Sequence, residues 1–153
     1  MTLEELHSWA IEQGATHYMR KLTPPAVTIS ATAGVMRLLE SDDFLSLRLA
    51  GCLLFHPELD LELLLLKLSE DGKVNLSHIV SCGRRVEPEE ELWIKLQAEV
   101  GSTTLEDAPH WSRFCTHGEK GYSYMGQKFV WLRPNKELFD SLMKRDEYGK
   151  WKP

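Results

Sequence analysis

The feature that most constrains the fold is a stretch of alternating apolar and polar residues over 59–81. From Leu59 to Leu63, leucines alternate with acidic residues as they do on a half-buried strand, and an apolar run follows. Next comes Asp71-Gly72, a pair that suits a tight turn because glycine accepts a positive φ. The returning stretch alternates again. The pattern predicts a β-hairpin over about 59–81.

A second hairpin is expected over about 122–132. Residues 122–125 and 129–132 are rich in aromatic and β-branched side chains, and Gly126-Gln127 between them suits a turn. Two hairpins separated by helices predict an α+β fold, whose mainly antiparallel sheet is packed by several helices. We expect residues 1–153 to form one such domain, because 153 residues is the ordinary size of one.

Helix signals lie between the hairpins and on both sides of them. The dense apolar segment 44–55 fits either a buried helix or a buried strand, and we favour the helix. Expected helices are 3–13 after the capping box Thr2/Glu5, a segment around 35–39 after Thr28 or Ser30, 88–100 between Pro88 and Gly101, a short one between Asp107 and Gly118, and a last one after Asn135.

The start of the chain and its three cysteines indicate the compartment. The first five residues, Met1 to Glu5, are acidic and do not resemble a secretory signal, and the longest apolar run, Leu63–Leu66, is far shorter than a membrane span. An odd number of cysteines argues against a secreted disulfide framework. We therefore expect a cytoplasmic protein without a membrane partner.

Charge is divided unevenly along the chain, whose formal net charge is -5. Residues 1–107 hold 9 Lys and Arg against 18 Asp and Glu, whereas residues 108–153 hold 9 against 5. The acidic part disfavours nucleic acid as a partner and would attract a basic protein by long-range steering. Nucleic-acid binding through the basic last third is a weaker alternative.

The leading hypothesis is a non-enzymatic protein that binds a macromolecule, such as an inhibitor or immunity-type protein that covers a basic partner. Tryptophan often dominates the binding energy of interfaces, so we also consider three other tryptophans as candidate anchors: Trp93, Trp111 and Trp131. The predicted partner-binding residues are the acidic side chains and one terminal tryptophan: Asp42, Asp43, Glu58, Asp60, Glu62, Glu87, Glu89, Glu90, Glu91 and Trp151.

A small enzyme or small-ligand-binding protein is the alternative hypothesis. Its candidate site gathers a thiol, imidazoles and a loop carboxylate from a short segment: His110, Cys115, His117, Glu119 and Tyr122. A nucleophilic thiolate needs a base within hydrogen-bond reach, and the sequence alone does not show that contact. In a helical segment, Cys115 and His117 would point to different sides.

No metal or cofactor is expected from the sequence. The cysteines and histidines lack the paired spacing of zinc sites, with neither CxxC nor HxxxH among Cys82, His110, Cys115 and His117. Phosphate-binding and nucleophile-elbow motifs such as GxGxxG, GxxxxGK[ST] and GxSxG are also missing. The sequence thus offers no specific catalytic signature.

Overall fold

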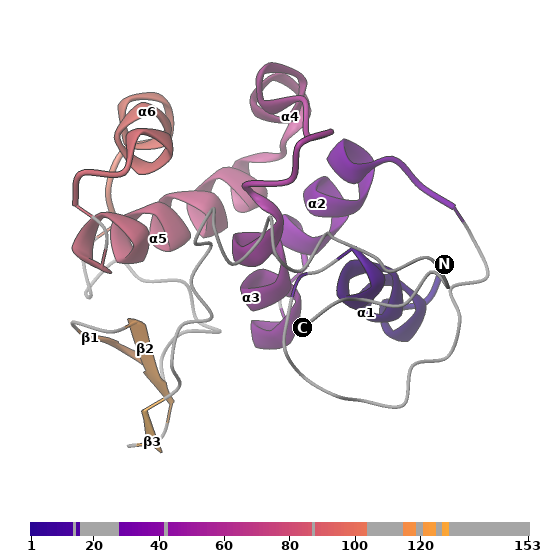
Figure 1. Ribbon diagram of the computed structural model, residues 1–153, viewed down its shortest axis with the longest axis horizontal. Coiled ribbons are helices and arrows are strands. Elements are labelled where there is room, and N and C mark those ends of the chain that lie inside the picture. Colours follow the sequence, from indigo (N-terminus) through magenta and orange to yellow (C-terminus); the bar gives the residue numbers. More distant parts are fainter. Residues whose placement is uncertain are drawn as a thin grey trace, which may run out of the picture.

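In a computed structural model, the described residues are 1–13, 15, 28–41, 43–86, 88–103, 115–118, 121–124 and 127–128. For Phe44, residues 85–86 and the strand residues, only the backbone is described. Figure 1 shows helices around a central α5, with three short strands to one side. The elements are α1 Leu3–Glu12, α2 Ala31–Leu39, α3 Phe44–Leu53, α4 Leu61–Lys67, α5 Glu70–Val86, α6 Glu91–Val100, β1 Cys115–Gly118, β2 Gly121–Tyr124 and β3 Gln127–Lys128.

The helices begin at the side chains that the sequence offers as caps. Thr2 and Glu5 form the expected capping box of α1, and Ser30 accepts a hydrogen bond from the Ala33 amide at the start of α2. The last helix, α6, ends at Gly101, whose φ of 75° is a conformation that favours glycine. The expected helices over 3–13, around 35–39 and in 44–55 are confirmed, while α6 begins three residues after Pro88.

The predicted hairpin over 59–81 is wrong, because this segment forms helices α4 and α5. Asp60 is an N-cap, and its carboxylate accepts a hydrogen bond from the Leu63 amide at 3.0 Å. Ser69 acts in the same way on the Gly72 amide at 3.1 Å. Two side-chain caps thus replace the strand start and the turn that the alternation suggested.

Gly72 lies in the first helical turn of α5 and does not form the β-turn of the predicted hairpin. Its role there is in packing. A Cβ atom at this position would lie 2.5 Å from the Leu68 side chain, so glycine leaves room for this side chain in its observed position. Leucines spaced for a helix then continue the buried face. Leu64, Leu68, Leu76, Ile79 and Val80 are all buried.

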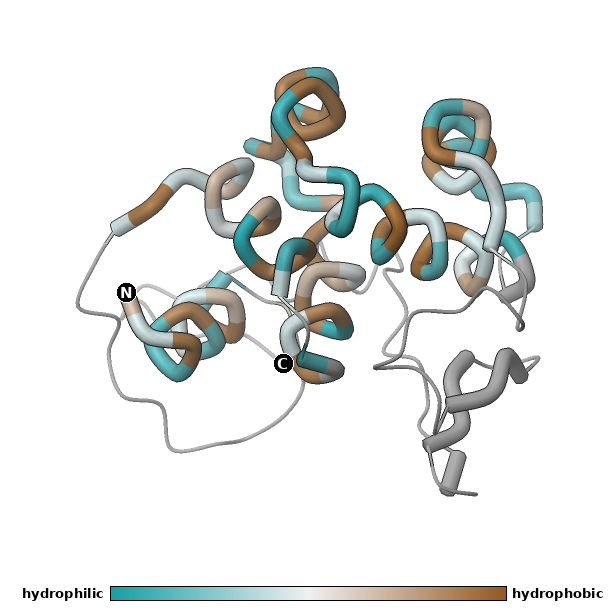
Figure 2. The backbone as a smooth tube through the Cα atoms, turned by 180° about the vertical axis from the view of Figure 1, so that it is seen from behind, coloured by the Kyte–Doolittle hydropathy of each residue, from teal (hydrophilic) through white to brown (hydrophobic). Residues whose placement is uncertain are grey.

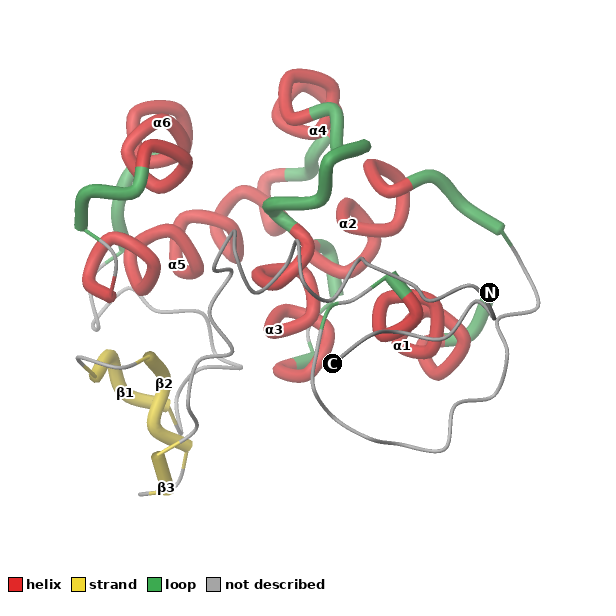
Figure 3. The backbone as a smooth tube through the Cα atoms, viewed as in Figure 1, coloured by secondary structure: helices red, strands yellow, loops and turns green. Residues whose placement is uncertain are grey.

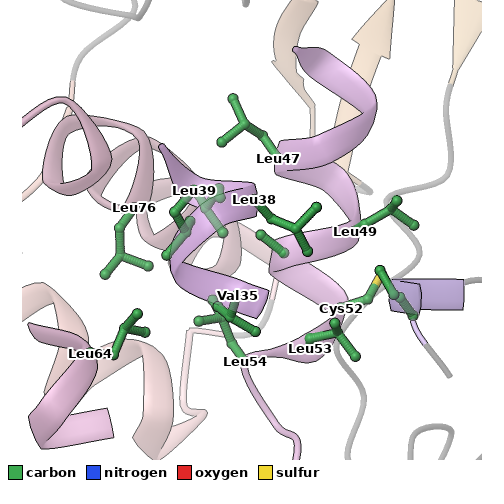
Figure 4. Packing of buried hydrophobic residues seen from close by; sticks show 14 of the residues in the cluster. Val35, Leu38, Leu39, Leu47, Leu49, Cys52, Leu53, Leu54, Leu64 and Leu76 are labelled. Atoms are coloured by element: carbon green, nitrogen blue, oxygen red, sulfur yellow. The ribbon is translucent and has the colours of Figure 1, made fainter. Parts of the chain in front are cut away.

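The hydrophobic core lies where α2, α3 and α5 meet. Figure 4 shows Val35, Leu38 and Leu39 of α2 among side chains from α3, α4 and α5. At the far end of α5, Trp93 of α6 packs against Phe55 with the rings edge to face at 5.6 Å. Helices and the turns that join them therefore supply the described core, and the predicted α+β fold on a mainly antiparallel sheet is wrong.

The strands form a small antiparallel sheet in the order β1-β2-β3 (Figure 3). Strand β2 pairs with β3 within the predicted 122–132 hairpin, with Tyr124 opposite Gln127. Residues 125–126 and 129–132 of that hairpin lie outside the described residues, as does the helix expected after Asn135. Cys115–Gly118 is a strand, so the helix expected between Asp107 and Gly118 does not extend through it.

Candidate functional site

Exposed carboxylates gather at the beginning of α4. Glu58 and Glu62 are exposed, and Asp60 is exposed while it caps the helix. The Asp60 amide also donates to the Thr32 hydroxyl of α2 at 2.9 Å, which fixes the entry of α4. Acidic groups are favoured at a helix N-terminus, which accounts for Asp60 at the cap and Glu62 in the first turn, whereas Glu58 precedes the helix.

A second acidic group lies at the beginning of α6. Glu89 and Glu91 are exposed, whereas Glu90 is half-buried at the N-cap and makes no side-chain capping hydrogen bond. The Pro88 carbonyl, just before them, accepts a hydrogen bond from Arg84 of α5, which ties this turn to the central helix. Figures 1 and 2 show both α4 and α6 projecting above α5.

Of the remaining predicted partner-binding residues, the structure describes only Asp43, and Asp43 does not join these two groups. Asp43 is half-buried at the N-cap of α3, where it accepts hydrogen bonds from the Ser46 amide and hydroxyl at 3.0 and 3.2 Å. Its role is therefore structural. Asp42, Glu87 and Trp151 lie outside the described residues.

Asp43 also belongs to a serine–histidine–aspartate cluster that sequence reasoning missed. His7 Nε2 lies 2.6 Å from Ser46 Oγ and 3.5 Å from Asp43 Oδ2. In a serine triad the carboxylate holds the ring nitrogen opposite the serine, and here both groups face the same nitrogen. Ser46 is fully buried, so no substrate reaches it. The cluster joins α1 to the beginning of α3.

Another histidine, His56, is buried in the turn after α3. Its Nε2 lies 3.1 Å from Gln13 Oε1, and its Nδ1 accepts a hydrogen bond from the Glu58 amide at 3.0 Å. These bonds fit a neutral imidazole that carries its proton on Nε2. Burial lowers the pKa of His56, and the nearby Glu58 carboxylate opposes this shift.

The described side chains show neither a reactive thiol nor a metal centre. Burial raises the pKa of Cys52 to about 12, against the weaker effect of Arg48, so the thiolate is strongly disfavoured. Cys82 is buried as well. No group of three metal-ligating side chains lies together in the part of the chain with described side chains.

Three of the five residues predicted for the alternative ligand site lie on the small sheet. Cys115 and His117 are two positions apart on β1, which places these positions on one face of a strand and corrects the expectation for a helix. Tyr122 lies opposite His117 in the β1–β2 register. The backbone thus brings three of the five residues together, while His110 and Glu119 lie outside the described residues.

The prediction that Trp93 is an anchor at an interface is wrong, because its side chain is fully buried. It lies over Gly83 of α5, where a Cβ atom would be 2.4 Å from the indole ring. Within the described part of the chain, its Nε1 is the one buried side-chain nitrogen or oxygen without a hydrogen-bond partner. Trp111 and Trp131 lie outside the described residues.

None of the described helices has the length and apolar character needed to cross a membrane. Searches against protein-family models, curated proteins and solved structures found no significant match to this chain.

Proposed function

We propose that the chain is a non-enzymatic binding protein that holds a basic protein partner on an acidic surface, defined by Glu58, Glu62, Glu89 and Glu91. The observation that supports this proposal is that all four side chains are exposed at the beginnings of α4 and α6. Among the described residues, none of the four forms an ion pair. Carboxylates on two helices that project from the same side of α5 would steer and hold a cationic surface.

The proposal is tested with a charge variant and a control that has the same net charge. The test variant carries Glu58→Gln, Glu89→Gln and Glu91→Gln, and it leaves the Asp60 cap and Glu62 unchanged. The control carries Glu4→Gln, Glu40→Gln and Glu99→Gln, three exposed carboxylates elsewhere. Each chain serves as bait in cross-linking and mass spectrometry at low and high salt.

We expect wild type and control to capture the same basic protein at low salt, and the test variant to lose it. The three substituted side chains are exposed, so circular dichroism should not change, although Glu58→Gln also removes the charge that raises the pKa of His56. Capture that is equal for all three baits, or a partner without a basic surface, would contradict the proposal. Resistance of the complex to high salt would also count against electrostatic recognition.

The β1–β2 register favours a small-ligand or enzymatic site at Cys115, His117 and Tyr122 as a second candidate function. Its test is alkylation of the native chain across pH, with Cys52 as an internal reference for a buried, unreactive thiol. A functional site predicts modification of Cys115 with an apparent pKa well below ~8.5 that rises in the His117→Ala variant. Modification at the rate of an ordinary thiol in both chains would exclude a nucleophilic role.

A further inference from the structure

The outer face of α4 exposes two leucines that the core does not use. Leu66 is 79% exposed and Leu63 is 38% exposed, three positions apart on one side of the helix. The opposite side is anchored by buried Leu64. Figure 2 shows hydrophobic residues along most of this helix, although only one of its faces contacts the core.

Charged residues of opposite sign flank the two leucines. At 100° per residue, Glu62 lies on one side of the Leu63–Leu66 stripe and Lys67 on the other, and both are exposed. Among the described residues neither has an ion-pair partner. This face therefore differs from the acidic surface, because the negative charge of Glu62 is balanced by the positive charge of Lys67.

This arrangement is complementary to itself. When two helices pack side by side in parallel, apolar residues at spacing three and four meet across the seam. The residue just before the first apolar position then faces the residue five places later in the other helix. In α4 these positions hold Glu62 and Lys67, so each glutamate of a pair would face a lysine.

We propose that this face, Glu62, Leu63, Leu66 and Lys67, binds a second copy of the chain, with the two α4 helices parallel around a two-fold axis. Leu63 and Leu66 pack on the same residues of the partner, and Glu62 lies beside the partner's Lys67. A uniformly basic partner would be repelled by Lys67, and a uniformly acidic partner would be repelled by Glu62. The contact shares Glu62 with the acidic surface, but it rests on a separate observation, the exposure of Leu63 and Leu66. One helix turn on each side buries little area, so the dimer is weak and depends on concentration.

Sedimentation velocity on the full chain tests the contact. We expect the weight-average mass of wild type to rise with concentration, and Leu66→Ser to weaken association by about tenfold or more. Leu3→Ser, which removes a 44% exposed leucine from α1, is the matched control and should behave as wild type. A wild-type chain that stays monomeric at all concentrations, or a Leu66→Ser chain that associates like wild type, would overturn the proposal.

Charge exchange tests the parallel orientation separately. Glu62→Lys alone and Lys67→Glu alone each place like charges across the seam, so each should weaken self-association several-fold. Mixed together, the two variants should form heterodimers, and the double variant should self-associate again. Circular dichroism verifies that every variant is folded. If neither mixing nor the double substitution restores association, the parallel contact is wrong.

Discussion

Two glycines of the core lie against tryptophan rings, and their missing side chains decide how closely helices approach. A Cβ atom on Gly34 of α2 would lie 2.1 Å from the Trp9 ring of α1, and Gly83 of α5 has the same relation to Trp93 of α6. Real Cβ atoms do not come this close to a neighbour. At these two positions glycine stabilises the fold by allowing close contact between helices, and this effect outweighs its low helix propensity.

The Gly34→Ala variant should be less stable than wild type by about 1–3 kcal/mol, because the overpacking exceeds the gain in helix propensity. Urea unfolding measures the difference. In a Trp9→Phe background the cost should shrink, since the clashing atoms belong to the six-membered ring of the indole, which the phenyl side chain does not reach. A cost that is equal in both backgrounds would show that Trp9 is not the cause.

At His56 the native state favours the neutral imidazole, because burial lowers its pKa from the ordinary 6.5. The unfolded chain then binds a proton more readily than the folded one. The stability contribution is therefore complete above about pH 6.5, and it is lost as pH falls from there towards the folded pKa. Below the folded pKa no further loss comes from this group.

The imidazole proton resonances of His56, followed by NMR across pH, should give a pKa below 6.5. Glu58→Gln should lower this pKa further, because the carboxylate favours the protonated ring and the amide does not. The Glu62→Gln variant removes an exposed carboxylate that does not contribute to the pKa shift of His56, and it should leave this pKa unchanged. A pKa that rises in Glu58→Gln would contradict the stated balance.

Among the elements, α1, α2 and α6 could be predicted from sequence because local side chains mark their ends. For α3 the sequence left helix and strand open and only favoured the helix. The segment 59–81 could not be predicted, because its alternating letters also match a helix with Leu64 and Leu68 on one face. The deciding facts are tertiary: the Asp60 amide bonds Thr32 of α2, and Gly72 packs against Leu68. Alternation of five residues was too short to exclude these contacts.

The candidate surface could also be predicted only in part, because sequence shows which residues are charged but not which tertiary contacts they make. Glu58, Glu62, Glu89 and Glu91 are exposed, as expected for charged residues. Sequence reasoning did not separate them from Asp43, which is occupied by the His7–Ser46 cluster, because that contact joins α1 to α3 across 39 positions. It also missed exposed Leu66, since an apolar residue in a leucine-rich run reads as core.

Removal of the α4 cap should destabilise the chain. Asp60→Ala deletes the carboxylate that accepts the Leu63 amide, at a cost of about 1 kcal/mol. Asp60→Asn keeps a side-chain oxygen for this bond and should cost only a few tenths of a kcal/mol. Thermal unfolding of the two variants provides the measurement. If both variants lose the same stability, charge at Asp60 matters and the capping bond does not.

In the whole molecule, α5 holds the other helices together through polar ties as well as apolar packing. Asn75 Nδ2 donates to the Leu39 carbonyl at the end of α2 at 2.7 Å, and Ser77 Oγ donates to the Gly101 carbonyl at the end of α6 at 3.1 Å. Both acceptors are carbonyls at helix ends, which lack partners within their own helices. One helix thus completes the ends of two others.

This central position predicts the order in which backbone amides exchange with solvent. The α5 segment Leu76–Val80 is buried on every side, whereas α4 is one short helix with an exposed outer face. Amides of Leu76–Val80 should therefore exchange only when the whole chain unfolds, and those of α4 through smaller openings. Native-state hydrogen exchange at several low denaturant concentrations separates these cases, because global unfolding depends steeply on denaturant and local opening does not. If α4 amides are as protected as Leu76–Val80, the helices unfold as one unit, and α5 has no special place in the stability of the fold.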